Sequence, residues 1–384
     1  MSSMKCRRTS ALPVLVILLT IHSASGQSLR QLEKQNAAVK YLRADLSLRQ
    51  SYSLPTDGWM GLEQAVTGSL TAEDEKLVSS GEEALREFEN GAHIQDCDWQ
   101  VSVQDGPFAS TAHRGAVREL VALAALRARI RFRDRQNEAG IQDLLAAYTA
   151  ARHLSLDGSI ASVLFAYRVE AEVSTVLEKS LNSLHPSELV ELESGLAKLP
   201  PGSGMKDAIT LEKLTRNDFL PIVRKVGTRD DLIRSFAHGI PTLNGDEKQA
   251  AETVKGCRGS LEGVLACIEK QNAFYAEWLS RFSLSPEQFQ SQYEPNFAQA
   301  SIENPILARF TPSLSRLRWA EAYNATRRAL VHTAVAVRRE GATGLANNRD
   351  PYDGLPFEYS VLPTGFKLQS RLRENGKSLS ISVE

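Results

Sequence analysis

The feature that most constrains the fold is a helical pattern of apolar residues that runs from residue 28 to about residue 340. Apolar side chains recur at the three-, four- and seven-residue spacings of one helix face, as at Leu29, Leu32, Val39, Leu42 and Leu46. Aromatic residues make up only 7% of the chain, which favours helices over a β-sandwich. We therefore predict a mainly α protein, either a multi-helical bundle or an irregular α-solenoid. No fixed-period repeat is present, so a regular helical array is not predicted.

Local signals divide this pattern into helices. Thr71 followed by Asp74 indicates a helix start, and Gly91 is expected to end that helix. Pro186 suits the first turn of another helix. Between residues 246 and 282 we expect one or two helices with an interruption around Gly256–Gly263, followed by a long helix over residues 313–340.

The last part of the chain changes period. Three runs of alternating apolar residues follow the turn signal Asp350-Pro351, and Asn375-Gly376 lies between the second and third runs as a two-residue hairpin signal. Three strands with one apolar face are about the minimum for a stable sheet. We predict a small antiparallel β meander at 350–384, packed on helix 313–340.

The first 26 residues are typical of a cleaved signal peptide. Lys5, Arg7 and Arg8 precede an apolar stretch over residues 11–21, which is too short to span a bilayer, and small residues follow it. An uncleaved anchor is the alternative. We expect an exported protein, periplasmic or extracellular and envelope-associated, with no transmembrane segment after cleavage.

Composition suggests two helical regions after the leader. The Pro- and Gly-rich stretch at 199–204 separates an N-terminal helical region, 27–198, from a C-terminal helical region, 205–340. The formal net charge of −1 argues against nucleic-acid binding, which calls for a basic domain. Envelope or secreted proteins are the expected partners.

Cysteines offer one candidate disulfide. Cys6 leaves with the leader, and Cys97, Cys257 and Cys267 stay. A bridge between Cys257 and Cys267 needs a helix break, because residues ten apart do not adjoin on a straight helix. The alternative is a pair of free buried thiols.

Candidate catalytic residues are few. His93, Cys97, Asp98 and His113 are plausible metal ligands, but their spacing matches no zinc motif, so no metal or cofactor is expected. His93, Asp98, His113 and His153 are the first residues to test for catalysis. No local motif for nucleophilic or phosphate chemistry is present, which favours a non-enzymatic role.

A basic repeat raises one further question. Arg127, Arg129, Arg131, Arg133 and Arg135 stand at alternate positions. We predict the cationic end of a helix, where positive charge complements the helix dipole. An anionic ligand or partner is the alternative.

The C-terminal residues also carry a resemblance. The sequence "DPYDGLPFEY" followed by "GFKLQS", after a long helix, resembles the tail of type II secretion major pseudopilins. The whole chain, including "CDW" at 97–99, is similar in style to uncharacterised exported helical proteins of environmental bacteria, of the planctomycete and acidobacterial type. The resemblance implies a helix followed by a small sheet.

Together these observations predict an exported helical binding or scaffold protein of unknown ligand, most simply non-enzymatic. One alternative is a hydrolase whose site is dispersed in sequence. The other is an accessory of a secretion or pilus-like machine, which the tail alone suggests.

Overall fold

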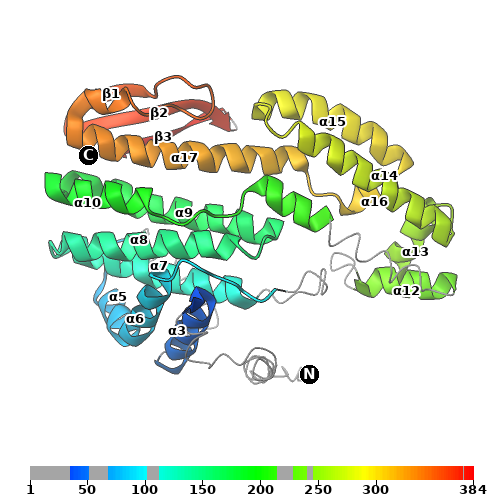
Figure 1. The fold of residues 1–384 in the computed structure, drawn as a ribbon, viewed down its shortest axis with the longest axis horizontal. Coiled ribbons are helices and arrows are strands. Elements are labelled where there is room, and N and C mark those ends of the chain that lie inside the picture. The colour runs from blue at the N-terminus through cyan, green and yellow to red at the C-terminus, as the bar shows by residue number, and fades with distance from the viewer. Residues whose placement is uncertain (1–34, 52–67, 102–111, 214–227, 240–244, 375) are drawn as a thin grey trace, which may run out of the picture.

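The structure, a computed structural model, describes residues 35–51, 68–101, 112–213, 228–239, 245–374 and 376–384. Within these ranges it contains thirteen α-helices and one three-stranded antiparallel sheet (Figure 1), so the predicted mainly α fold with a C-terminal meander is confirmed. The predicted signal peptide lies outside the described residues. The helices are α3 (Ala37–Ser51), α5 (Ala72–Ser80), α6 (Glu82–Ala92), α7 (Ala112–Arg133), α8 (Asn137–Ser155), α9 (Ile160–Ser180), α10 (Pro186–Ala197), α12 (Arg229–Gly239), α13 (Glu247–Gly256), α14 (Leu261–Ser280), α15 (Pro286–Glu303), α16 (Pro305–Phe310) and α17 (Leu314–Glu340), and the strands are β1 (Glu358–Leu362), β2 (Gly365–Glu374) and β3 (Lys377–Val383).

Side-chain caps set several helix starts. The Thr71 hydroxyl accepts a hydrogen bond from the Asp74 backbone N–H at 3.2 Å, and the Asp74 carboxylate accepts one from the Thr71 N–H at 2.8 Å. This reciprocal capping box satisfies two backbone donors that the helix itself leaves free. Pro186 occupies the first turn of α10. Both predicted helix starts are confirmed.

The prediction that Gly91 ends its helix was wrong. The segment forms two helices, α5 and α6, which meet at Gly81, and α6 continues through Gly91 to Ala92. A Cβ atom at Gly91 would lie 2.9 Å from Cε1 of Tyr41 in α3. Gly91 is therefore needed because α3 and α6 approach closely there, and a helix-end signal cannot be told from a close-packing glycine by sequence alone.

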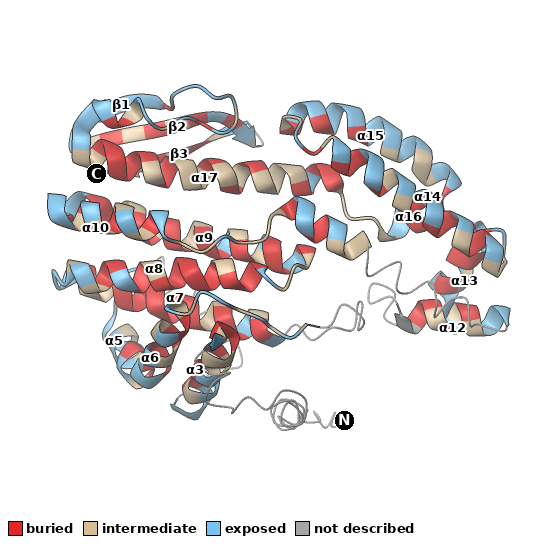
Figure 2. Cartoon of the chain, viewed as in Figure 1, coloured by how far each residue is buried: buried red, intermediate tan, exposed pale blue. Residues whose placement is uncertain are grey.

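The largest core lies among α3, α6, α7, α8 and α9. α7 and α8 are buried on several sides, and Figure 2 shows them as the most continuously buried helices of this region. Their buried faces carry many alanines, such as Ala124, Ala125, Ala147 and Ala151, which let neighbouring helices approach. A helix that is apolar on most of its surface has to be covered on most sides.

The long helix α17 joins this core to the rest of the molecule (Figure 1). Its C-terminal half contributes Leu330, Val331 and Ala334 to the largest core and packs on α9, α10 and the sheet. Its N-terminal half contributes Leu314 and Leu317 to a second, aromatic cluster with α14 and α15. A single helix therefore supports elements from both sides of the 199–204 segment.

The second cluster is rich in aromatic rings. Trp278 of α14 is fully buried and meets Tyr293 of α15 edge-on, with ring centroids 5.1 Å apart. Met205 and Ile209, which follow the 199–204 segment, pack in the same cluster with Ile160 of α9. Phe274 and Trp278 of α14, with Phe282 in the turn after it, all pack in this cluster.

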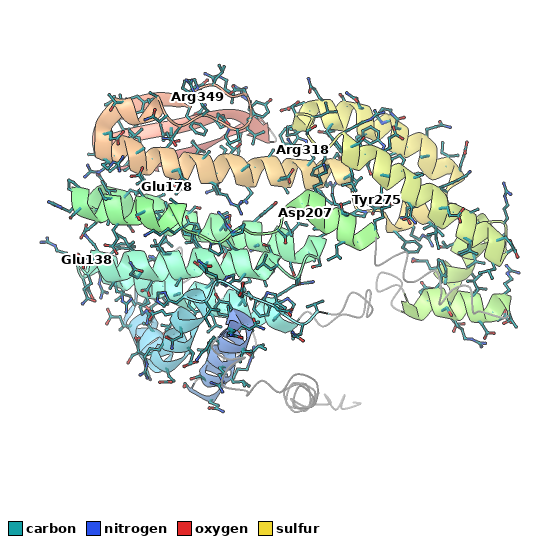
Figure 3. All side chains as sticks on the ribbon, in the orientation of Figure 1. Glu138, Glu178, Asp207, Tyr275, Arg318 and Arg349 are labelled. Carbon is teal, nitrogen blue, oxygen red and sulfur yellow. The ribbon has the colours of Figure 1, made fainter. Side chains whose placement is uncertain are left out.

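The sheet has the order β1-β2-β3 and packs on α17 through β2 and β3. Register places Tyr359 of β1 opposite Leu368 and Val361 opposite Phe366, so these four side chains share the face that turns toward the core. Glu178 of α9, labelled in Figure 3, accepts a hydrogen bond from the Ser382 N–H of β3 at 2.7 Å. The third strand is thereby fastened to the helical core.

Candidate functional site

The structure brings together two of the four candidate catalytic residues, His113 and His153. His113 lies in the first turn of α7 and His153 in the last turn of α8. Both contact Trp99, which belongs to the irregular segment before α7. The Trp99 indole stacks on the His113 ring at a centroid distance of 4.7 Å, and its N–H donates to the backbone carbonyl of His153 at 2.7 Å. Tyr41 of α3 also stacks on Trp99, with ring centroids 5.9 Å apart. We call these four residues the Trp99 cluster.

His153 is fully buried and uses both ring nitrogens. Its Nδ1 lies 2.9 Å from the Tyr41 hydroxyl, and its Nε2 lies 3.2 Å from the backbone carbonyl of Gln95. A neutral ring fits both contacts, with Nε2 donating to the carbonyl and Nδ1 accepting from the hydroxyl. Burial lowers the pKa of His153 to about 4, because a charged ring would lose its hydration. His153 therefore ties α3 to α8 and leaves no ring atom for a substrate.

His113 is almost fully buried and pairs with a carboxylate. Its Nε2 lies 3.0 Å from Oδ2 of Asp157, in the turn between α8 and α9. Asp157 also accepts hydrogen bonds from the Ser162 hydroxyl and from the Ser159 N–H. These bonds lower the pKa of Asp157 against the opposing effect of burial.

This arrangement differs from a catalytic triad in its order. In a Ser–His–Asp triad the histidine lies between the hydroxyl and the carboxylate. Here Asp157 lies between His113 and Ser162, so the imidazole cannot take the proton of that hydroxyl. His113, Asp157 and Ser162 instead link α7, the turn after α8 and α9 where these elements meet.

The other two candidates lie outside the Trp99 cluster. The Asp98 carboxylate accepts from the Gln100 N–H at 2.8 Å, and its backbone bonds the side chain of Asn36, so Asp98 shapes the loop. His93 is exposed at the end of α6. Burial raises the pKa of the nearby Cys97 thiol, which disfavours the thiolate needed for nucleophilic or ligand chemistry. Among the residues that the structure describes, no three His, Cys, Asp or Glu side chains converge to hold a metal ion.

A second buried polar group was not predicted. Glu170 of α9 is 1% exposed and accepts hydrogen bonds from Arg152 of α8 and from Arg328 of α17, the latter at 2.6 and 2.8 Å. Asn324, oriented with its oxygen toward Arg328, accepts from that guanidinium at 3.1 and 3.2 Å. We call Glu170, Arg152, Arg328 and Asn324 the Glu170 cluster.

A signal for the Glu170 cluster does exist in the sequence. Glu170 stands seven residues after Val163, four after Ala166 and three before Val173, all of which are buried. A carboxylate on the apolar face of a helix has to meet a cation, because burying an unpaired charge is strongly unfavourable. The cation's identity, however, depends on which helices pack together.

Two of the alternating arginines, the buried Arg127 and the half-buried Arg131, belong to a third polar group, whereas Arg133 and Arg135 are exposed. Arg127 is 3% exposed and donates to Asp143 of α8 and to Glu82 and Glu89 of α6, while Arg131 pairs with Asp143 at 2.8 Å. The last turn of α7 does carry cations, Arg131 and Arg133, as predicted. The guanidiniums of Arg127, Arg131 and Arg133 pair with carboxylates of the same chain. Because these guanidiniums already have carboxylate partners, the structure does not favour the alternative that they bind an external anion.

The three polar groups share one chemical character. Each joins side chains from two or more helices, and each carboxylate is satisfied by donors within the chain. Such groups fix how helices pack and lack a free, activated nucleophile or base. None of the described helices is long and apolar enough to cross a membrane.

Comparisons with known proteins add no relative. No family model matches the chain, and neither the search of curated proteins nor that of solved structures finds a match.

The exposed edge of the sheet at β1 differs from these buried polar groups. β1 is the end strand of the sheet, so one of its edges has no neighbouring strand among the described residues. On its core-facing side Tyr359 is 36% exposed and Val361 75% exposed, although their partners across the ladder, Leu368 and Phe366, are buried. Figure 2 shows this strand as largely exposed. We call β1 with the exposed Leu355 the β1 edge.

Proposed function

We propose that this protein is an exported, non-enzymatic helical binding or scaffold protein. We further propose that its β1 edge binds an extended segment of an envelope or secreted protein as a fourth strand. The observation that carries this proposal is the exposure of Tyr359 and Val361 beside an open strand edge, on the face that is buried everywhere else in the sheet. In strand addition, backbone hydrogen bonds supply affinity and alternate side chains supply selectivity.

The size of the β1 edge supports a single peptide segment over a second folded copy. β1 has five residues and is bounded by Pro356 and Pro363, which cannot extend a ladder. A stable interface between folded proteins buries about 1,200–2,000 Å² and uses about 20–30 residues on each side. Tyr359 and Val361 stand two residues apart, so the matching segment carries apolar residues at alternate positions.

The alternatives receive less support. A hydrolase would need a free general base or nucleophile, yet His113 and His153 are engaged with Asp157, Tyr41 and a backbone carbonyl. An accessory role in a secretion machine agrees with the resemblance of the tail. It would make the bound segment part of such a machine.

Site-specific photo-crosslinking in the native host tests the proposal. A photoreactive residue replaces Val361 in the full-length protein, and the same residue at Ile302 of α15, which is 78% exposed, serves as the matched control. We expect a crosslink from position 361, but not from 302, to one envelope or secreted protein, within a segment of alternating apolar residues. Tyr359→Lys should abolish it. A crosslink only to a second copy of this chain, no crosslink, or equal crosslinking from both positions would contradict the proposal.

A further inference from the structure

Two cysteines lie where α13, α14 and α16 join, at the end of the molecule near α12 in Figure 1. Cys257 directly follows α13, and Cys267 lies in the second turn of α14. Between the helices the chain reverses through Arg258 and Gly259, both with positive φ, at 63° and 66°. The reversal places both cysteines in the same buried cluster, where the neighbouring Cys267 thiol contributes to the raised pKa of Cys257. The helix interruption predicted at Gly256–Gly263 is confirmed.

The placement of the two cysteines is held from several sides. A Cβ atom at Gly263 would lie 1.9 Å from the Cys257 carbonyl oxygen, so only glycine lets α14 start this close to the end of α13. The Asn304 side chain donates to the Cys267 carbonyl at 2.8 Å, and Ile306 of α16 packs in the same cluster as both cysteines. Packing from three helices therefore holds the two cysteines within one small buried cluster.

We infer that Cys257 and Cys267 form a disulfide bond in the mature protein, an inference that rests on the proposed export. Two thiols lose two protons and two electrons as the S–S bond forms. A thiol–disulfide oxidoreductase, or a small-molecule disulfide such as oxidised glutathione, accepts them and is reduced to its dithiol or to two thiols. Exported compartments are those in which such bonds persist.

Burial indicates when the bond forms and what it does. Cys257 is 1% and Cys267 8% exposed, and burial with the neighbouring thiol raises the pKa of Cys257 to about 12. A folded, reduced thiol of this kind reacts slowly, so oxidation belongs to the folding stage. Among the described residues, the cluster around the two cysteines has fewer buried members than the other two, and small cores gain most from a covalent link. The bond is structural and does not take part in redox catalysis.

Peptide mapping tests the inference and separates it from the question of export. Trypsin without reduction should yield residues 256–258 linked to residues 259–270, lighter by two hydrogens than the separate peptides, while Cys97 is alkylated by N-ethylmaleimide. Full-length protein refolded in a glutathione redox buffer should show this link. If Cys257 and Cys267 are alkylated there instead, the inference is overturned. If the link forms in vitro but protein from the native host has both thiols free, the two cysteines are able to pair, but the bond is absent from the mature protein and the proposed export fails.

A stability measurement supplies a second readout. A reducing agent should lower the Tm of the α12–α16 part of the wild-type protein by several degrees. The same agent should not change the Tm of the Cys257→Ser or the Cys267→Ser variant. Cys97→Ser is the control and should keep the sensitivity of the wild type. Equal sensitivity of all variants would contradict the inferred bond.

Discussion

At the scale of single residues, the buried polar side chains hold helices together in this chain. His153, Glu170 and Arg127 are each at most 3% exposed, and each bonds groups from other helices. A buried polar group that keeps all its partners specifies one packing arrangement, whereas a group that loses one partner is strongly destabilising. Substitutions at these positions should therefore change stability rather than an activity.

His153 should make stability depend on pH. Its folded-state pKa, about 4, lies below the ordinary value of 6.5, so the unfolded chain binds a proton first as the pH falls. The contribution of His153 to the free energy of unfolding should be fully present above pH 6.5. It should fall by up to about 3 kcal/mol as the pH approaches 4, because each unit of pKa shift corresponds to about 1.4 kcal/mol. Urea titrations of wild type and His153→Gln across this range measure it. An unchanged pH slope in the variant would refute this role of His153.

Glu170 should be among the residues most sensitive to truncation. Glu170→Ala leaves Arg152 and Arg328 without their shared carboxylate, and breaking a buried ion pair costs about 3–5 kcal/mol. Arg168→Gln on the same helix is the control, because Arg168 is 54% exposed and an exposed pair contributes about 0–1 kcal/mol. Chemical denaturation measures both. Similar losses of unfolding free energy in the two variants would show that the Glu170 cluster does not stabilise the protein more than an exposed ion pair does.

At the scale of elements, helix and strand boundaries follow from local residues. Thr71, Pro186 and the break near Gly259 could be predicted because capping and positive φ depend on a few neighbouring side chains. The alternation after Phe357 predicted the sheet for the same reason. Gly91 was misassigned because its role depends on Tyr41, fifty residues earlier, which local sequence does not reveal.

Two helical glycines should respond in opposite ways to alanine. Gly91→Ala places a Cβ against the buried Tyr41 ring and should destabilise the protein by about 1–3 kcal/mol. Gly115→Ala in α7 meets no atom within 4 Å and should stabilise it by about 0.5–1 kcal/mol, through the higher helix propensity of alanine. Thermal denaturation compares the two. Stabilisation by both substitutions would contradict the close packing of α3 on α6.

At the scale of the whole molecule, α17 connects the helical core, the aromatic cluster and the sheet. The sequence predicted this helix and the sheet beside it, but it did not predict which distant residues meet. His113 and His153 lie forty residues apart and converge only because Trp99 packs between α7 and α8. The cations that satisfy Glu170 come from α8 and α17, so the Glu170 cluster exists only once three helices are assembled.

Hydrogen–deuterium exchange on the complex with the crosslinked partner tests the central claim most directly. If the β1 edge accepts a fourth strand, backbone N–H groups within residues 358–362 become hydrogen-bonded and exchange more slowly in the complex than in the free protein. Val361→Lys should abolish both binding and protection, whereas Ile302→Lys should preserve them. Binding that leaves exchange in 358–362 unchanged, or that protects only another surface, would contradict the account.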